Sequence, residues 1–250
     1  TALADYYPRA TVSELQRTLS NLIQRTCRHW YENREQPRRT RNLVELYQKG
    51  LHLHTWDEVW QGIARVYPEI DAPMFAFPGV DGKFRNPKRW LEENRYAVYL
   101  PVWLATTHGD LNEHNILVTE DGRTWLIDFY RSGAGHILRD LVELECAIKF
   151  NLAGVTDLAA YHRFETTLLQ QTRLDQPISP ASDAPEGKAL AVIAHLRALG
   201  SGFTEPGMRE YNTALLLHTL YMLSLDFLYE VEPHKRARGL LAAAMIASTL

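Results

Sequence analysis

The sequence has few cysteines and no strong excess of charge of either sign. Cys27 and Cys146 are the only cysteines among 250 residues, and their separation does not match the spacing of metal ligands. Two such thiols suit a reducing compartment such as the cytoplasm, or they can form a single disulfide bond. The formal net charge of -3 lacks the basic excess that is typical of proteins that bind nucleic acids or membrane surfaces. We therefore expect a cytoplasmic protein that has neither of these partners.

The sequence also lacks a run of apolar residues long enough to cross a membrane. Its longest apolar run, Ala214–Tyr229, is interrupted by His218 and Asp226 and falls short of the roughly 20 residues that a membrane-spanning helix needs. The run therefore predicts a buried core helix. No signal peptide opens the chain. The first residue is Thr1 rather than methionine, which indicates a processed chain or a piece of a longer protein.

Apolar periodicity and capping residues predict a mainly helical chain of the α+β class. With 46% hydrophobic residues the chain can bury one sizeable core, and no change in composition divides it, so we expect a single domain over residues 1–250. Thr11 and Glu14 form a capping box before the first helix, and Asp140 with Glu143 predicts another. The expected helices cover residues 11–30, 42–53, 56–66, 140–150, 157–172, 187–199, 208–231 and 235–249.

Other segments are expected to be irregular. Residues 72–86 and 174–186 contain several prolines and predict loops, the first with room for one short strand. The basic run at Arg38, Arg39 and Arg41 follows Pro37. We interpret it as a solvated loop, and the alternative is a basic contact surface.

The clear β signal is a hairpin between residues 116 and 127. Ile116–Val118 and Trp125–Ile127 are apolar runs, and Asp121 and Gly122 supply a turn between them. A pair of short apolar runs joined by Asp-Gly is typical of two antiparallel strands.

Three polar residues flank this hairpin. Asp110 and Asn115 lie before its first strand, and Asp128 closes its second. Phosphoryl transfer from ATP needs such a set, because a carboxylate and an amide oxygen can bind Mg²⁺, which prefers oxygen ligands. A further carboxylate accepts the proton of the attacking hydroxyl. In protein kinases the catalytic-loop Asp precedes its Asn by five residues, and Asp110 and Asn115 have this spacing.

The segments HGDLNEHNILV and WLIDF, which carry these residues, resemble the catalytic and metal-binding segments of the aminoglycoside phosphotransferase and choline kinase family. These enzymes are relatives of the protein kinases. The resemblance implies the C-terminal lobe of a protein kinase-like fold, with ATP as phosphate donor and Mg²⁺ as cofactor. By that resemblance Asp110 is the catalytic base, while Asn115 and Asp128 bind Mg²⁺ and its nucleotide. It further implies that His108 braces the loop and that Asp140 is a structural cap.

The acceptor implied by these segments is a hydroxyl group of a small molecule. Gly109 stands where many protein kinases have an arginine that pairs with a phosphate on the activation segment, so no phosphorylation switch is expected. Only eleven residues separate Asp128 from Asp140, and no A-P-E motif follows, which leaves little room for a peptide-docking platform.

Two other interpretations of these residues remain. Asp110 and Asn115 can be loop caps, with Asp128 a turn residue at a strand end. Alternatively, His108, Asp110 and His114 can form a metal site, although no further ligand set is visible.

The sequence shows none of the motifs that mark the nucleotide-binding lobe of a kinase. No G-x-G-x-x-G loop and no strand lysine precede His108; Lys49 ends a predicted helix, and Lys83 and Lys88 lie in a stretch rich in Gly and Pro. We therefore expect an upstream nucleotide-binding lobe of the same protein as a partner. Residues 1–250 alone are then expected to bind Mg-ATP weakly and to transfer no phosphate. The alternative function is a non-catalytic, kinase-like regulatory or binding module of a larger protein.

Overall fold

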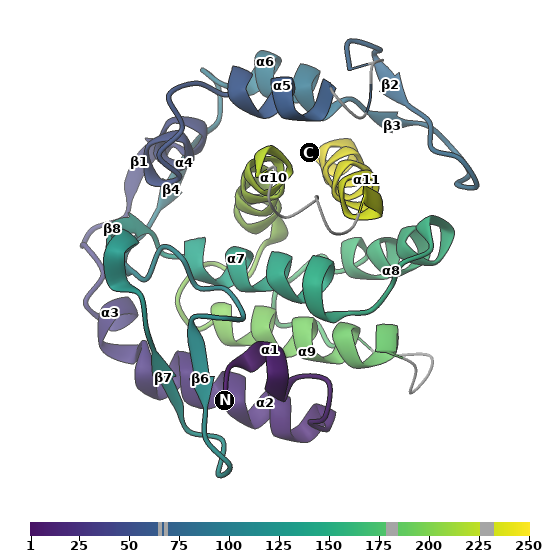
Figure 1. Ribbon diagram of the computed structural model, residues 1–250. Coiled ribbons are helices and arrows are strands. Elements are labelled where there is room, and N and C mark those ends of the chain that lie inside the picture. The colour runs from purple at the N-terminus through teal and green to yellow at the C-terminus, as the bar shows by residue number, and fades with distance from the viewer. Residues whose placement is uncertain (65–66, 68–69, 179–184, 226–232) are drawn as a thin grey trace. The chain divides into compact units, whose positions relative to one another are not determined.

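The computed structural model describes residues 1–64, 67, 70–178, 185–225 and 233–250 (Figure 1). Over these residues it is a mainly helical α+β protein with small antiparallel sheets. The chain forms two compact units, each assembled from three separate segments. Unit 1 comprises Thr1–Arg39, Pro101–Gly154 and Gln171–Met208, and unit 2 comprises Thr40–Leu100, Val155–Gln170 and Arg209–Leu250. The interpretation of residues 1–250 as a single domain stays a prediction.

The helices of unit 1 pack around α9 (Pro185–Gly200), which contacts both α2 (Val12–Asn21) and α7 (Arg139–Ala147) (Figure 1). The predicted capping box of α2 is confirmed, because Thr11 Oγ1 accepts from the Glu14 amide and the Thr11 amide donates to the Glu14 carboxylate. The remaining helices of this unit are short: α1 (Leu3–Tyr6), η1 (Leu22–Thr26), α3 (Arg28–Glu32), η2 (Phe129–Arg131) and η3 (Ile148–Leu152).

Two antiparallel strand pairs belong to unit 1. The predicted hairpin is confirmed: β6 (Ile116–Val118) pairs with β7 (Thr124–Leu126). The second pair joins β5 (Leu104–Thr107) to β8 (Gly133–His136), and the sequence patterns did not predict either strand. In this pair Gly135 is a diagonal neighbour of Thr107 on the facing strand. A Cβ at Gly135 would come within 2.9 Å of Thr107 Oγ1. The absence of a side chain at Gly135 allows this close strand approach.

Unit 2 is built mainly from helices. Within it, α11 (Pro233–Thr249) packs against α8 (Leu158–Leu169), α6 (Pro87–Asn94) and strand β3 (Phe84–Arg85), which pairs with β2 (Met74–Phe75). The other helices of this unit are α4 (Leu43–Gly50), α5 (Asp57–Ala64) and α10 (Met208–Ser224), which starts at the end of unit 1.

The core of the predicted apolar helix is buried as expected. Tyr211 and Leu215–Leu217 are fully buried on α10. The parts of the predicted helices at residues 65–66 and 226–231, and the loop at 179–184, lie outside the described residues. Within the described parts of the chain, no helix has the length and hydropathy needed to span a bilayer.

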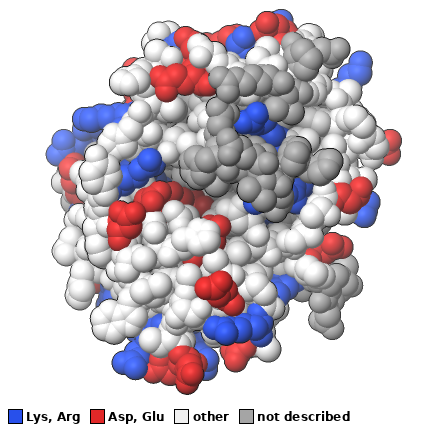
Figure 2. Space-filling model, in the orientation of Figure 1, with Lys and Arg blue, Asp and Glu red and all other residues white. Residues whose placement is uncertain are grey.

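The basic run after Pro37 is not a loop, because Arg39–Asn42 forms strand β1. Arg39 and Thr40 are exposed there, and an exposed strand does not need the apolar alternation that we used to recognise strands. Strand β4 (Tyr99–Val102) was likewise not expected. On the visible face, acidic and basic side chains are interspersed (Figure 2), in line with the small net charge.

Candidate functional site

The loop between β5 and β6 holds Asp110 and Asn115 in direct contact. The Asn115 Nδ2 group donates to the backbone oxygen of Asp110 and to its carboxylate Oδ2, both at 2.8 Å. Asn115 is buried, whereas Asp110 is half-buried. Since both donors of an amide lie on its nitrogen, these bonds fix the orientation of the Asn115 side chain. Its Oδ1 atom forms no hydrogen bond with any residue that the structure describes.

Asp128 follows β7 and lies at the same end of the hairpin. The amide of the preceding residue, Ile127, donates to the Asn115 backbone oxygen at 3.1 Å. Asp128 itself is exposed and has left-handed backbone angles, φ 61° and ψ 68°, a conformation that Asp tolerates better than most residues. Neither Asp110 nor Asp128 forms an ion pair with a cationic side chain of the described segments. The three predicted site residues therefore gather at the end of the hairpin away from its turn.

His108 supports this arrangement from inside unit 1. Its ring is buried, and Nε2 lies 2.9 Å from the backbone oxygen of Ile127. The ring also packs against Trp30 and Phe129, with ring centroids 6.5 and 5.2 Å away. These contacts fix the position of the His108 ring beside the end of the hairpin. They engage Nε2 of the imidazole, whereas Nδ1 is buried without a hydrogen-bond partner in the described parts of the chain.

Asp140 does not cap its own helix, which corrects the sequence prediction. The N-cap of α7 is Leu138, which makes no side-chain capping bond. Instead, the fully buried Asp140 carboxylate accepts from the amides of His108 and Gly109, at 2.8 and 2.9 Å, and from the Tyr31 hydroxyl at 2.9 Å. A carboxylate in the first turn can satisfy donors of any segment that packs there, and here the loop before Asp110 supplies them.

One further residue of α7 holds the same loop, and sequence reasoning missed its role. Arg139 Nη2 donates to the Gly109 backbone oxygen at 2.7 Å. Glu143, which we expected to cap the helix, is buried on the same helix. Burial raises the pKa of Glu143 to about 8, and repulsion by Asp140 and Asp110 adds to the rise, while Arg139 and the Leu111 amide oppose it. Helical spacing is the available signal, because residues 139, 140 and 143 lie near one another on the first turn.

Gly109 allows the loop to approach its surroundings closely. Its φ is +76°, and a Cβ there would collide with the Arg131 backbone oxygen and lie 3.1 Å from the Arg139 guanidinium carbon. Gly109→Ala is therefore expected to lower the free energy of unfolding by roughly 3 kcal/mol, more than the about 1–2 kcal/mol of left-handed strain alone. Urea denaturation measures the difference.

Gly79→Ala is the matched control for this substitution. Gly79 has a φ of +73°, but a Cβ there would meet nothing within 4 Å, so only the backbone strain is expected. Equal destabilisation by the two variants would show that the close approach at Gly109 has no energetic consequence.

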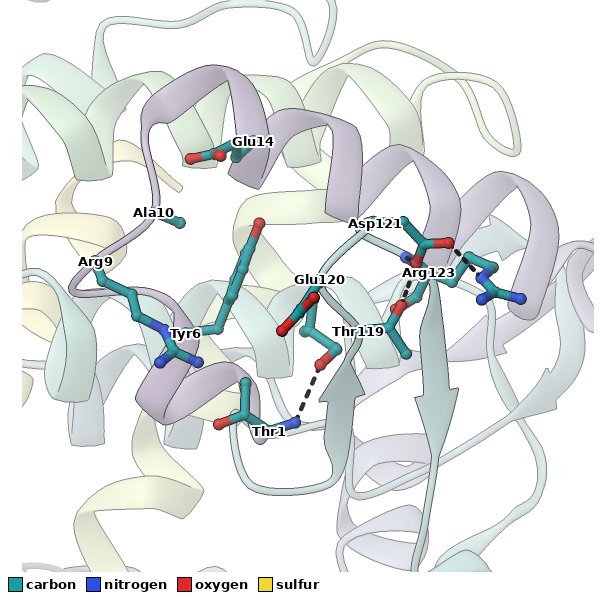
Figure 3. A pocket seen from close by; sticks show the side chains of 10 residues that line it. Thr1, Tyr6, Arg9, Ala10, Glu14, Thr119, Glu120, Asp121 and Arg123 are labelled. Carbon is teal, nitrogen blue, oxygen red and sulfur yellow. Dashed lines mark hydrogen bonds and ion pairs between the residues drawn. The ribbon is translucent and has the colours of Figure 1, made fainter.

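A cavity of about 930 Å³ lies at the opposite, turn end of the hairpin (Figure 3). Several of its charged groups are already engaged, since Asp121 bonds with Arg123 at 2.8 Å and Glu14 belongs to the capping box of α2. None of Asp110, Asn115 and Asp128 lines this cavity. It is therefore separate from the candidate site.

The structure also bears on the metal site and the disulfide that the sequence left open. Among the residues that the structure describes, no three His, Cys, Asp or Glu side chains group as a metal site would require. Cys27 and Cys146 are both buried thiols, so they do not form the single disulfide that the sequence allowed.

The fold and the site define a mainly helical α+β protein whose Asp-Asn loop is anchored by the first turn of a helix. The chain belongs to the ternary complex associated domain 9 family, whose model matches residues 76–224, more than half of its length. The matched range contains the whole loop and the hairpin. No curated protein matches the chain.

Proposed function

We propose that the protein is an ATP-dependent phosphotransferase that acts on a hydroxyl group of a small molecule. In this proposal residues 1–250 are the catalytic C-terminal lobe of a protein kinase-like fold. The observation that carries the proposal is the contact between Asn115 and Asp110, which fixes both side chains. It leaves the Asn115 Oδ1 atom and one Asp110 carboxylate oxygen without a partner in the described chain.

Asp110 is the general base in this proposal. Its Oδ2 accepts from Asn115, so Oδ1 remains to accept the proton of the acceptor hydroxyl. The bond from Asn115 and the anchors on the backbone of Gly109 hold the carboxylate in one position. A base held in one position lowers the entropic cost of reaching the reactive geometry. Such positioning is a large part of catalysis in phosphoryl transfer.

Asn115 and Asp128 fit a magnesium site. Each offers a side-chain oxygen that no described cation or donor occupies, and Mg²⁺ prefers oxygen ligands and keeps several waters. The exposure of Asp128 leaves space for phosphate oxygens beside it. Bound Mg²⁺ would offset the negative charge of the ATP phosphates.

The partners in this proposal are a small-molecule acceptor and a nucleotide-binding lobe upstream in the same protein. Two of the lysines before His108 do not lie on a strand, where a kinase has its phosphate-binding lysine. Lys49 lies in the last turn of α4, and Lys88 on α6 pairs with Asp71 at 2.5 Å. At Gly109 the loop has no side chain with which to bind a phosphorylated activation segment. A free hydroxyl compound fits this arrangement better than a peptide.

Mg-ATP binding tests the metal assignment. In the full-length protein, Asp128→Ala is expected to weaken Mg-ATP binding by roughly 10-fold or more, because it removes a charged ligand. Titration calorimetry with ATP in the presence and absence of Mg²⁺ measures this. Glu120→Ala removes an exposed carboxylate from the turn of the same hairpin and should leave the affinity unchanged. Equal affinities for the Asp128 variant and the wild type would remove Asp128 from the proposed site.

A non-catalytic module is the second candidate function. The family description, ternary complex associated domain, favours a role in an assembly. Exposed apolar side chains also flank Asp128: Ile127 and Phe129 are about half exposed, and Tyr130 is 93% exposed. Such residues are common at protein interfaces. Binding of a partner that Ile127→Ser and Phe129→Ser abolish, without ATP consumption under any condition, would favour this function over the enzyme.

A further inference from the structure

The part of the loop between Asp110 and Asn115 is held from outside by two bonds of Glu113. The Glu113 backbone oxygen accepts from the Ala4 amide at 3.0 Å, and its carboxylate Oε1 accepts from Asn151 Nδ2 at 2.7 Å. Glu113 is 5% exposed, so this carboxylate has little access to water. A hydrogen bond to a carboxylate is roughly twice as strong as one between neutral groups, which makes the bond from Asn151 the stronger of the two.

Asn151 comes from the same helical segment that anchors the start of the loop. It lies in η3 (Ile148–Leu152), a π-helical turn that begins where α7 ends. At the other end of this segment, Asp140 accepts from the amides of His108 and Gly109. Such π-helical turns are rare and are found often at functional sites. Together, α7 and η3 therefore hold both the start and the end of the loop.

Hydrogen bonds inside the loop connect Glu113 to Asn115. The Asn112 amide donates to the Asp110 backbone oxygen at 3.0 Å, and the Asn112 backbone oxygen accepts from the Asn115 amide at 3.2 Å. The Asn112 side chain accepts from the His114 amide at 3.0 Å. The loop is thus one short hydrogen-bonded turn, and a displacement of Glu113 changes the position of Asn115.

We propose that Glu113 and Asn151 are positioning residues for Asn115. Their bond fixes the backbone directly before Asn115, so that the Asn115 amide donates to both the backbone oxygen and the carboxylate of Asp110. Asn115 Oδ1 is then held in place for the metal ion, a consequence that rests on the proposed phosphotransferase function. Loss of a side chain that orients a metal ligand typically lowers metal affinity by roughly 10- to 100-fold.

Exchange of the donor and the acceptor tests this bond. Asn151→Asp places a second carboxylate against Glu113, and repulsion between the two is expected to separate η3 from the loop. In Glu113→Gln/Asn151→Asp the bond returns with its direction reversed, because the glutamine amide donates to the new carboxylate. Asn151→Ala removes the donor without adding a charge, and it gives the same measurement if Asn151→Asp does not fold.

The side-chain amide resonance of Asn115 is the direct readout, and it does not depend on activity. In the full-length protein with isotopically labelled asparagine, this resonance reports the two bonds to Asp110. Its chemical shift is expected to move, and its hydrogen exchange to accelerate, in Asn151→Asp and in Asn151→Ala. Both values should return to those of the wild type in Glu113→Gln/Asn151→Asp. An Asn115 resonance that is unchanged in Asn151→Ala, or that the double variant does not restore, would overturn the proposal.

Asn21→Asp is the matched control. The Asn21 Nδ2 group donates to the Gly122 backbone oxygen at 2.9 Å, at the turn end of the hairpin, so this variant also exchanges an amide donor for a carboxylate beside the hairpin. The Asn115 resonance should stay at its wild-type position. A shift as large as that in Asn151→Asp would show that any perturbation of unit 1 reaches Asn115, which contradicts a specific role of Asn151.

Mg-ATP binding extends the test to the proposed function. Titration calorimetry on the full-length protein should show that Asn151→Asp weakens Mg-ATP binding by roughly 10-fold or more and that the double variant recovers it. If Mg-ATP does not bind but the Asn115 resonance moves as expected, the function fails and the positioning role stands. If Mg-ATP binds and the resonance does not move in Asn151→Ala, the positioning role fails and the function stands.

Discussion

Asp110→Asn is expected to lower phosphotransfer in the full-length protein by roughly 100- to 10,000-fold, the range that a general base contributes. Mg-ATP affinity should change little, because the proposed metal ligands Asn115 and Asp128 are untouched. The Asn115 amide can still donate to the oxygen of the new side chain, so the loop should keep its conformation. Coupled ATP-consumption assays with a panel of hydroxyl compounds give the rate, and titration calorimetry gives the affinity.

Asp121→Asn is the control for this change. Asp121 lies on the turn of the same hairpin, where it pairs with Arg123, and its substitution should leave the rate near the wild-type value. A parallel loss of rate and Mg-ATP affinity in Asp110→Asn would make Asp110 a metal ligand rather than the base. A rate unchanged by Asp110→Asn would exclude the proposed mechanism.

Arg197→Leu is expected to lower the free energy of unfolding by about 3–5 kcal/mol, the usual effect of removing one partner of a buried ion pair. Arg197 on α9 and Glu145 on α7 are both fully buried and form two bonds, at 2.8 and 2.6 Å. Arg197 also donates to Gln171 Oε1 at 2.7 Å. Loss of the guanidinium removes both of these bonds from the buried Glu145 carboxylate. Chemical denaturation followed by circular dichroism measures the change.

The double variant Arg197→Leu/Glu145→Leu completes a thermodynamic cycle. Removing both charges should recover most of the stability lost in the single variant, because an apolar pair no longer carries a desolvation cost. If the double variant is less stable than Arg197→Leu, packing rather than charge explains the loss. A single variant within about 1 kcal/mol of the wild type, the range of exposed ion pairs, would contradict the buried pair.

Local patterns were sufficient for much of the secondary structure. The capping box of α2 depends on Thr11 and Glu14, three residues apart, and the hairpin depends on two short apolar runs around Asp121 and Gly122. Strands with little apolar character were not recognised. Arg39–Asn42 is mostly polar and β8 is rich in glycine, so neither shows the alternation that marks a half-buried strand.

The sequence by itself determined the neighbourhood of Asp110, Asn115 and Asp128. Five residues separate the first two, and the hairpin returns the chain to Asn115 just before Asp128, so short-range geometry brings them together. Which side chains hold the loop around these residues was decided only by the tertiary structure. Asp140 binds amides 31 and 32 residues away in the sequence, and no local pattern distinguishes that contact from a helix cap. The proton affinity of Glu143 likewise comes from burial beside Asp140 and Asp110, because desolvation and charge repulsion depend on which groups the fold places side by side.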